Sequence, residues 1–277
     1  MDSFELYVYS YHFFSLNFSF LVARAAIILE LVLGIGLVSN CFHRLMLWGS
    51  MAMLMGYTML LLYAQYVVGR TDSCHCFGDV LQFNPLQSIL KNIVLMLLFH
   101  FVKKVEGFSF RRDSLALLAT VGVVSIGVFV VSPPDNFTSS YQTQQNVNME
   151  QLAEAMEQPP LETLQLDEGK KIVCFFSTGC EYCQLSARKL SLMQQYYGFS
   201  PDDICYVFMG TEEGRERFYE VSQSKHYKDV IFEDAIGLLK ITNGLFPVML
   251  LLENGMVVHE YEFRSMKEDE IKSFMLD

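Results

Sequence analysis

The chain has 277 residues, of which 52% are hydrophobic and 18% are charged, with a formal net charge of −11. So large an apolar fraction excludes a disordered chain and argues against a single soluble domain. The charge is uneven, because residues 1–132 carry eight Lys and Arg against seven Asp and Glu, whereas residues 133–277 carry twelve against twenty-four. Neither half has the basic surface that nucleic-acid binding requires, and we expect no nucleic-acid partner.

Four apolar stretches in the first half are each near the roughly 20 residues that a helix needs to cross a bilayer. They lie at about 18–38, 45–68, 86–102 and 115–131. The third contains Lys91, whose ammonium we expect to reach the membrane interface. The apolar segment 4–16 carries no cleavage site and is interpreted as an interfacial extension of the first helix. The sequence therefore predicts an all-α four-helix bundle over residues 1–132, with the lipid bilayer as a partner.

Basic residues concentrate in two of the loops between these stretches. His43 and Arg44 follow the first stretch, and four Lys and Arg lie between the third and the fourth. The positive-inside rule places both loops in the cytoplasm. The N-terminus, the loop at 70–85 and everything after Ser132 then lie outside. We therefore expect a four-pass protein of a bacterial inner membrane, with its N-terminus and C-terminal half in the periplasm.

The second half changes character after Pro133-Pro134. A polar, aperiodic segment follows, and residues 133–165 are interpreted as a linker. Strands and helices then alternate over 166–277, with expected strands at 171–177, 204–209, 247–253 and 256–263 and expected helices at 181–197, 212–222, 235–241 and 266–275. Asn254-Gly255 is a typical hairpin turn between the last two strands. This order predicts an α/β domain.

The strongest motif is Cys180-Glu181-Tyr182-Cys183, which follows an expected buried strand and begins a helix. This is the setting of a redox-active CxxC pair. The helix N-terminus favours a thiolate on Cys180, the expected nucleophile, and Cys183 is placed one turn later to resolve a mixed disulfide. Glu181 should oppose thiolate formation. The alternatives are a structural disulfide or half of a zinc site, which would need a second pair nearby; we expect no metal.

A second pair, Cys74 and Cys76, lies in the outer loop with His75 between them. Two cysteines one residue apart close only a small, strained ring, and strained exposed disulfides are labile. His75 could lower a thiol pKa or transfer a proton. The alternatives are a metal clip, which would need a distant fourth ligand, and thiols with a structural role. The favoured hypothesis is a redox-active pair.

Four further residues are candidates for redox or proton chemistry. Glu30 lies in the middle of the first apolar stretch, where an ionisable group is costly; it could transfer a proton or form a polar contact between helices. Cys174 and Cys205 lie within expected strands and are interpreted as core residues, with a third redox thiol as the alternative for Cys174. Cys41, on the opposite side of the membrane from the loop pair, is interpreted as inert, with a cytoplasmic entry point for electrons as the alternative.

Residues 160–277 resemble the thioredoxin superfamily, on the evidence of the strand, turn and CxxC at 171–183 and of Gly244-Leu245-Phe246-Pro247-Val248 before the hairpin. The resemblance implies that Pro247 is a cis-proline facing the disulfide and that the Phe246 backbone pairs with a substrate chain. Two positions depart from the family. Gly179 replaces the usual Trp, and Cys174 replaces the buried acidic residue that shuttles protons.

Residues 10–132 resemble the MauE branch of the DoxX-like redox-associated membrane proteins, on the evidence of a four-helix plan with a Cys-x-Cys-Phe-Gly loop on its outer face. This resemblance implies a role in the disulfide chemistry of exported proteins. The fusion is also similar in plan to bacterial vitamin K epoxide reductase homologues, although the membrane half lacks their second cysteine pair.

Together these features indicate a membrane-anchored thiol–disulfide oxidoreductase. Electrons would pass between exported protein thiols, Cys180/Cys183 and Cys74/Cys76. We favour the oxidising direction, with a quinone as final acceptor. The alternatives are a reductive relay with reversed flow and a non-catalytic assembly factor for a periplasmic redox protein.

Overall fold

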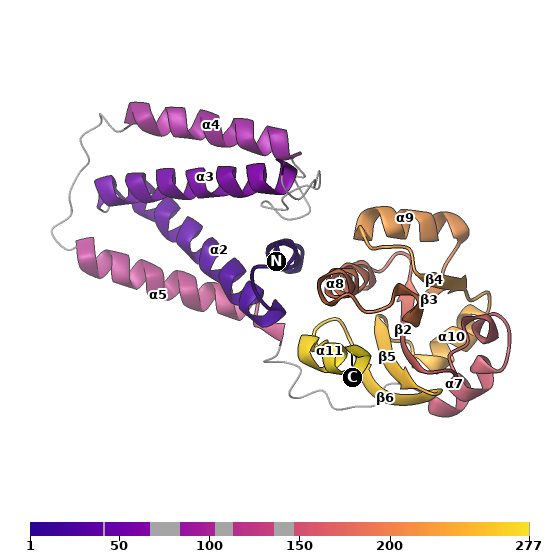
Figure 1. Ribbon diagram of the computed structural model, residues 1–277. Helices are drawn as coiled ribbons and strands as arrows, with labels where there is room; N and C mark the ends of the chain where they lie inside the picture. The colour runs from indigo at the N-terminus through magenta and orange to yellow at the C-terminus, as the bar shows by residue number, and fades with distance from the viewer. Residues whose placement is uncertain (41, 67–83, 103–112, 136–146, 277) are drawn as a thin grey trace. The chain divides into compact units, whose positions relative to one another are not determined.

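The computed structural model describes residues 1–40, 42–66, 84–102, 113–135 and 147–276. These residues form two compact units, which divide between Pro134 and Asp135. The first unit is helical and the second contains a five-stranded sheet flanked by helices (Figure 1).

The first unit contains five described helices: α1 (Asp2–Tyr9), α2 (Leu16–Val38), α3 (His43–Tyr66), α4 (Pro85–Val102) and α5 (Asp113–Val131). Three are long and apolar enough to cross a membrane, namely α2, α3 and the Ser114–Val131 part of α5. The apolar part of α4, Leu86–Phe101, is shorter. A helical N-terminal region with three to four apolar helices is thus confirmed, whereas the four-pass bundle stays a prediction.

The expected interfacial extension of the first membrane helix is wrong, because α1 is a separate helix. The chain turns between α1 and α2, with His12 in the left-handed region at φ 57°. Glu5 of α1 forms a 2.8 Å ion pair with Arg24 of α2, and both side chains are buried. Burying two opposite charges together is tolerated because each neutralises the other. This pair therefore fixes α1 against α2.

The second unit is built on the sheet order β4-β3-β2-β5-β6. Its strands are β2 (Lys170–Ser177), β3 (Ile204–Met209), β4 (Lys228–Ile231), β5 (Val248–Glu253) and β6 (Met256–Tyr261). β2, β3 and β4 are parallel, whereas β5 is antiparallel to both β2 and β6. This topology confirms the expected thioredoxin-like α/β fold and adds β4, which the sequence analysis missed.

Both faces of the sheet are covered, as Figure 1 shows. Helices α8 (Glu181–Tyr197) and α9 (Glu212–Ser222) cover one face, where Phe176 stacks on Phe218 at 5.4 Å between ring centroids. Helices α7 (Met149–Met156) and α10 (Ala235–Ile241) cover the other face, and α11 (Glu268–Leu276) ends the described chain. The central strands are buried on both sides, which explains why their sequences are almost continuously apolar.

The second unit begins earlier than the expected domain start at residue 166. Val147, Leu152, Leu161 and Leu164 are buried in the same core cluster as β2, so residues 147–165 do not behave as a linker. The reason is that helical periodicity over α7 puts its apolar residues on one face, which packs under the sheet.

The first residue of this unit, Asp135, is also tied to it. Its carboxylate lies 3.5 Å from the fully buried ammonium of Lys189 and 2.9 Å from the guanidinium of Arg264. Lys189 also donates to the carbonyl of Phe263 at 3.0 Å. The buried ammonium is therefore both charge-paired and hydrogen-bonded, as a buried cation must be.

Candidate active site

Cys180 and Cys183 lie at the connection between the end of β2 and the start of α8. β2 ends at Ser177, a two-residue turn follows, and Cys180 is the N-cap of α8. The sulfur of Cys180 accepts a hydrogen bond from the backbone N–H of Cys183 at 3.2 Å. Cys180 is partly exposed, Cys183 is fully buried, and both are free thiols. The accessible thiol is thus the first of the pair, as expected for a nucleophile, and the resolving thiol lies behind it.

The surroundings of the two thiols push their pKa values apart. The pKa of Cys180 is lowered to about 7, chiefly because the Cys183 thiol donates a hydrogen bond to its sulfur. Burial and the charge of Glu181 oppose this shift, and the backbone N–H groups of Cys183 and Tyr182 assist it. The pKa of Cys183 is raised by burial and by its thiol donating to Cys180. A thiolate nucleophile beside a protonated resolving thiol is the arrangement that disulfide exchange requires.

The loop before β5 lies at the same edge of the sheet. In the antiparallel pair, Phe175 of β2 is opposite Val248 of β5. One step further, Pro247 falls opposite Phe176, just before the turn that leads to Cys180. The peptide bond between Phe246 and Pro247 is cis, as the resemblance implied, and Pro247 is buried. The register therefore brings Phe246 and Pro247 to the edge from which the CxxC turn departs.

One cluster beside the CxxC motif was missed by the sequence analysis. Tyr182, within the motif, is 45% exposed, and its ring lies 5.5 Å from that of Phe263. The guanidinium of Arg264 lies 5.8 Å from the Tyr182 ring. Phe263 and Arg264 follow β6 with no motif of their own, so only tertiary packing reveals them as neighbours of the site.

The remaining thiols of the second unit are buried. Cys174 in β2 and Cys205 in β3 have no exposed surface. Burial raises the pKa of Cys174 well above its ordinary value, and burial likewise raises that of Cys205 to about 11. Cys174 sits on the α8 face of the sheet and Cys205 on the α7 face, since Cys205 belongs to the core cluster beneath α7. Both environments favour protonated thiols in the core.

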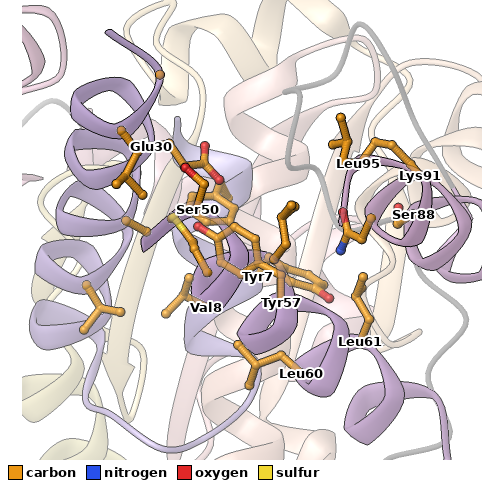
Figure 2. A pocket seen from close by; sticks show the side chains of 18 of the residues that line it. Tyr7, Val8, Glu30, Ser50, Tyr57, Leu60, Leu61, Ser88, Lys91 and Leu95 are labelled. Carbon is orange, nitrogen blue, oxygen red and sulfur yellow. The ribbon is translucent and has the colours of Figure 1, made fainter. Parts of the chain in front are cut away.

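Only some of the candidate residues in the N-terminal half lie in segments that the structure describes. Cys74, His75 and Cys76 lie outside the described residues, as does Cys41. Glu30 is described and lines a cavity between α1, α2, α3 and α4 (Figure 2). Tyr57 of α3 lines the same cavity. Arg24 is not the partner of Glu30, as expected, because Arg24 pairs with Glu5.

Lys91 lines the same cavity as Glu30 and lies close enough to interact with that carboxylate electrostatically. A single cation within an apolar helix could have signalled this, because ionisable groups in membrane helices usually face the protein interior. Its reach to the membrane interface stays a prediction. Within the described residues, no three His, Cys, Asp or Glu side chains gather as a metal site would require.

Comparison with known proteins decides the nature of the first unit. Residues 1–105 match the family model described as methylamine utilisation protein MauE. The N-terminal part of this chain is a MauE domain. The chain thus joins a MauE membrane domain to a thioredoxin-like domain.

A relative shares much of this length. Protein TlpB of Flavobacterium psychrophilum is 24% identical over 288 residues, which span 84% of this chain and 77% of that protein. The match is longer than either the MauE domain or the thioredoxin-like domain alone, so the two chains are similar across both.

Solved structures are similar to part of this chain. The thioredoxin domain of a thiol-disulfide oxidoreductase from Bacteroides vulgatus is 17% identical, with a TM-score of 0.33 over 40% of this chain and 81% of that one. A thiol:disulfide interchange protein from Bacteroides sp. is 15% identical, with a TM-score of 0.33 over 41% and 78%. The fold assignment rests on the sheet order and register described above.

Proposed function

We propose that the protein is a membrane-anchored thiol–disulfide oxidoreductase, with Cys180 as nucleophile and Cys183 as resolving thiol. The observation that carries the proposal is the contrast between the two thiols. Cys180 is accessible, caps a helix and has a pKa lowered to about 7, whereas Cys183 is buried and has a raised pKa. A structural pair would need neither the accessible sulfur nor the donors aimed at it.

The chemistry is an exchange of bonds. The Cys180 thiolate attacks one sulfur of a client disulfide, the client S–S bond breaks, and a mixed disulfide forms as the other client sulfur leaves as a thiolate. Cys183 then loses its proton and attacks Cys180, which releases the second client sulfur and leaves Cys180–Cys183 oxidised. The reverse sequence oxidises a client dithiol. Phe246 and Pro247, at the same sheet edge, are proposed to bind the client chain.

The second part of the proposal is a relay. The Cys74/Cys76 pair of the MauE domain exchanges disulfides with Cys180/Cys183, and His75 and Glu30 transfer protons. The proposed location is a bacterial inner membrane crossed four times, with the N-terminus and the thioredoxin-like domain in the periplasm. The apolar helices and the MauE match support the membrane assignment, and the charge of the loops supports the orientation.

The proposed direction is oxidising, with a quinone as final acceptor. Oxidation of one dithiol to a disulfide releases two electrons and two protons, and a quinone takes up the same number to become a quinol. Exported dithiols would therefore be oxidised at the expense of the quinone pool. The reverse flow is the competing version, in which a reductant supplied to the loop pair reduces client disulfides.

The test is the redox state of Cys180/Cys183 in cells, measured by acid-quenched thiol alkylation. The intact protein is compared with a Cys74→Ser/Cys76→Ser variant. An oxidised pair that becomes reduced in the variant supports the oxidising relay, and a reduced pair that becomes oxidised supports the reverse flow. No difference would contradict the relay.

A second comparison separates an enzyme from an assembly factor that uses its cysteines only for binding. Cys180→Ser and Cys183→Ser should each abolish exchange with a client disulfide. Cys205→Ser, in the core on the α7 face, is the matched control. If both CxxC variants support client maturation as well as wild type, the enzymatic proposal is wrong.

A further inference from the structure

The MauE domain contains a cavity of ≈420 Å³ that the disulfide chemistry of the second unit does not use. Helices α1, α2, α3 and α4 all contribute to its wall, as Figure 2 shows for Tyr7, Glu30, Tyr57 and Lys91. Its volume lies within the range of about 300–1,000 Å³ that is usual for small-molecule sites. All the described residues of its wall belong to the first unit.

The lining combines flat aromatic surface with a small polar group. Phe4, Tyr7, Phe13 and Phe14 belong to the lining, and most of the remaining wall is aliphatic. Aromatic rings stack favourably on a flat ring, and aliphatic walls accept a hydrocarbon tail. The cavity therefore favours a lipid-soluble ligand with a ring.

The polar side chains in the wall make a pure hydrocarbon a poor ligand for this cavity. Glu30, Tyr57 and Lys91 all line the cavity and bring a carboxyl, a hydroxyl and an ammonium to its wall, and Lys91 interacts electrostatically with Glu30. Covering these groups with an alkyl chain would remove their water and return no hydrogen bond, which is costly. A ligand that carries hydrogen-bond acceptors on its ring would receive bonds from Tyr57 and Lys91.

We propose that this cavity is the binding site of a quinone, a ring dicarbonyl with a hydrophobic tail. Lys91 and Tyr57 donate hydrogen bonds to a ring carbonyl, and Glu30 balances the charge of Lys91. The assignment rests on the proposed function, because it supplies the site at which electrons from thiols leave the protein. The ring takes up two electrons and two protons, and the matching two of each come from one dithiol that becomes a disulfide.

Gly34 offers a steric test of the site. It lines the cavity one turn after Glu30 on α2, and a Cβ built on it has no heavy atom within 4 Å. A Gly34→Leu side chain would therefore enter the cavity without striking a neighbour at its Cβ. Gly122→Leu on α5 is the matched control, because Gly122 also has open space and does not line the cavity.

The experiment is photolabelling of the full chain in lipid nanodiscs with an azido-ubiquinone, with labelled peptides located by mass spectrometry. We expect labels on α2, α3 or α4 that excess decylubiquinone removes. Gly34→Leu should reduce labelling about tenfold or more, and Lys91→Met should weaken it about tenfold because a charged donor is lost. Gly122→Leu should label as wild type does.

Several results would overturn the proposal. They are undiminished labelling in both Gly34→Leu and Lys91→Met, labels confined to α5, or competition by decylbenzene, which has no carbonyl, as strong as that by decylubiquinone. The last would mean that the cavity holds lipid chains. The Cys180→Ser/Cys183→Ser protein should label normally, so a failure of thiol exchange and a failure of quinone binding give separate results.

Discussion

Glu5 and Arg24 form a buried ion pair with 2.8 Å between the carboxylate and the guanidinium. Arg24 also donates to the carbonyls of Ser132 and Pro133, which follow α5. One side chain on α2 thus contacts both α1 and the residues that follow α5, the last helix of the first unit. Its three-carbon stem and forked guanidinium suit this task, because Arg offers five donors in a fixed plane.

Removing the acid should destabilise the MauE domain. Glu5→Gln leaves the Arg24 charge buried without its counter-ion, a change that costs about 3–5 kcal/mol in typical buried pairs. We expect a lower melting temperature for the full chain in mild detergent. The double variant Glu5→Leu/Arg24→Met should recover part of this loss, since no charge is then buried. Equal melting temperatures for Glu5→Gln and wild type would show that the pair does not hold α1.

Alkylation of Cys180 should titrate near pH 7. The thiolate is the reactive form, and the pKa of Cys180 is lowered to about 7, so the rate should rise with pH through that value and then level off. Cys183→Ala removes the thiol that donates to Cys180 and should move the midpoint upward. Cys183→Ser keeps a donor and serves as the control. A midpoint that is the same in all three proteins would exclude Cys183 as the cause.

Glu181 should have the opposite effect on the same midpoint. Its negative charge raises the pKa of Cys180, so Glu181→Gln should lower the midpoint of alkylation and increase reactivity at pH 6. Glu212→Gln, in the first turn of α9, changes the same charge elsewhere and should leave the midpoint unchanged. A shift of equal size in both variants would indicate a general effect of net charge.

Cys174 and Cys205 should resist alkylation while the protein is folded. Neither side chain has exposed surface, and burial raises the pKa of both thiols. We expect peptide mass spectrometry to find modified Cys180 and unmodified Cys174 and Cys205 under native conditions. All three should react in denaturant. Rapid modification of Cys174 in the folded protein would favour a third redox thiol.

Leu245 should contribute to the binding of protein clients but not to the binding of small substrates. It precedes Phe246-Pro247 and is 42% exposed, at the sheet edge that carries the CxxC turn. Leu245→Ser should slow exchange with an unfolded protein disulfide about tenfold, as loss of an apolar contact in an interface does. Reduction of a small aromatic disulfide should be unchanged. Val221→Ser, at the far end of α9, is the exposed control, and equal losses in both variants would contradict a binding role for the loop.

Local patterns were enough to predict most of the second unit. The bounds of α8, β3, α9 and α10 agree with the sequence analysis, because caps and turns mark their ends. Thr211, for example, accepts from the N–H of Gly214 to begin α9. β4 was missed because four residues with a single apolar pair carry no clear period, and only pairing with β3 defines them as a strand.

The sequence by itself determined the two-part plan, the apolar helices and the CxxC turn, since each depends on residues that are close together in the chain. Only the tertiary structure decided which ionisable groups meet. Arg24 forms its ion pair with Glu5, and Lys91 lines the same cavity as Glu30. Apolar residues between 147 and 165 are buried in the core of the second unit. The physical reason is that burial and charge pairing join residues far apart in sequence, so their outcome depends on packing that no local pattern contains.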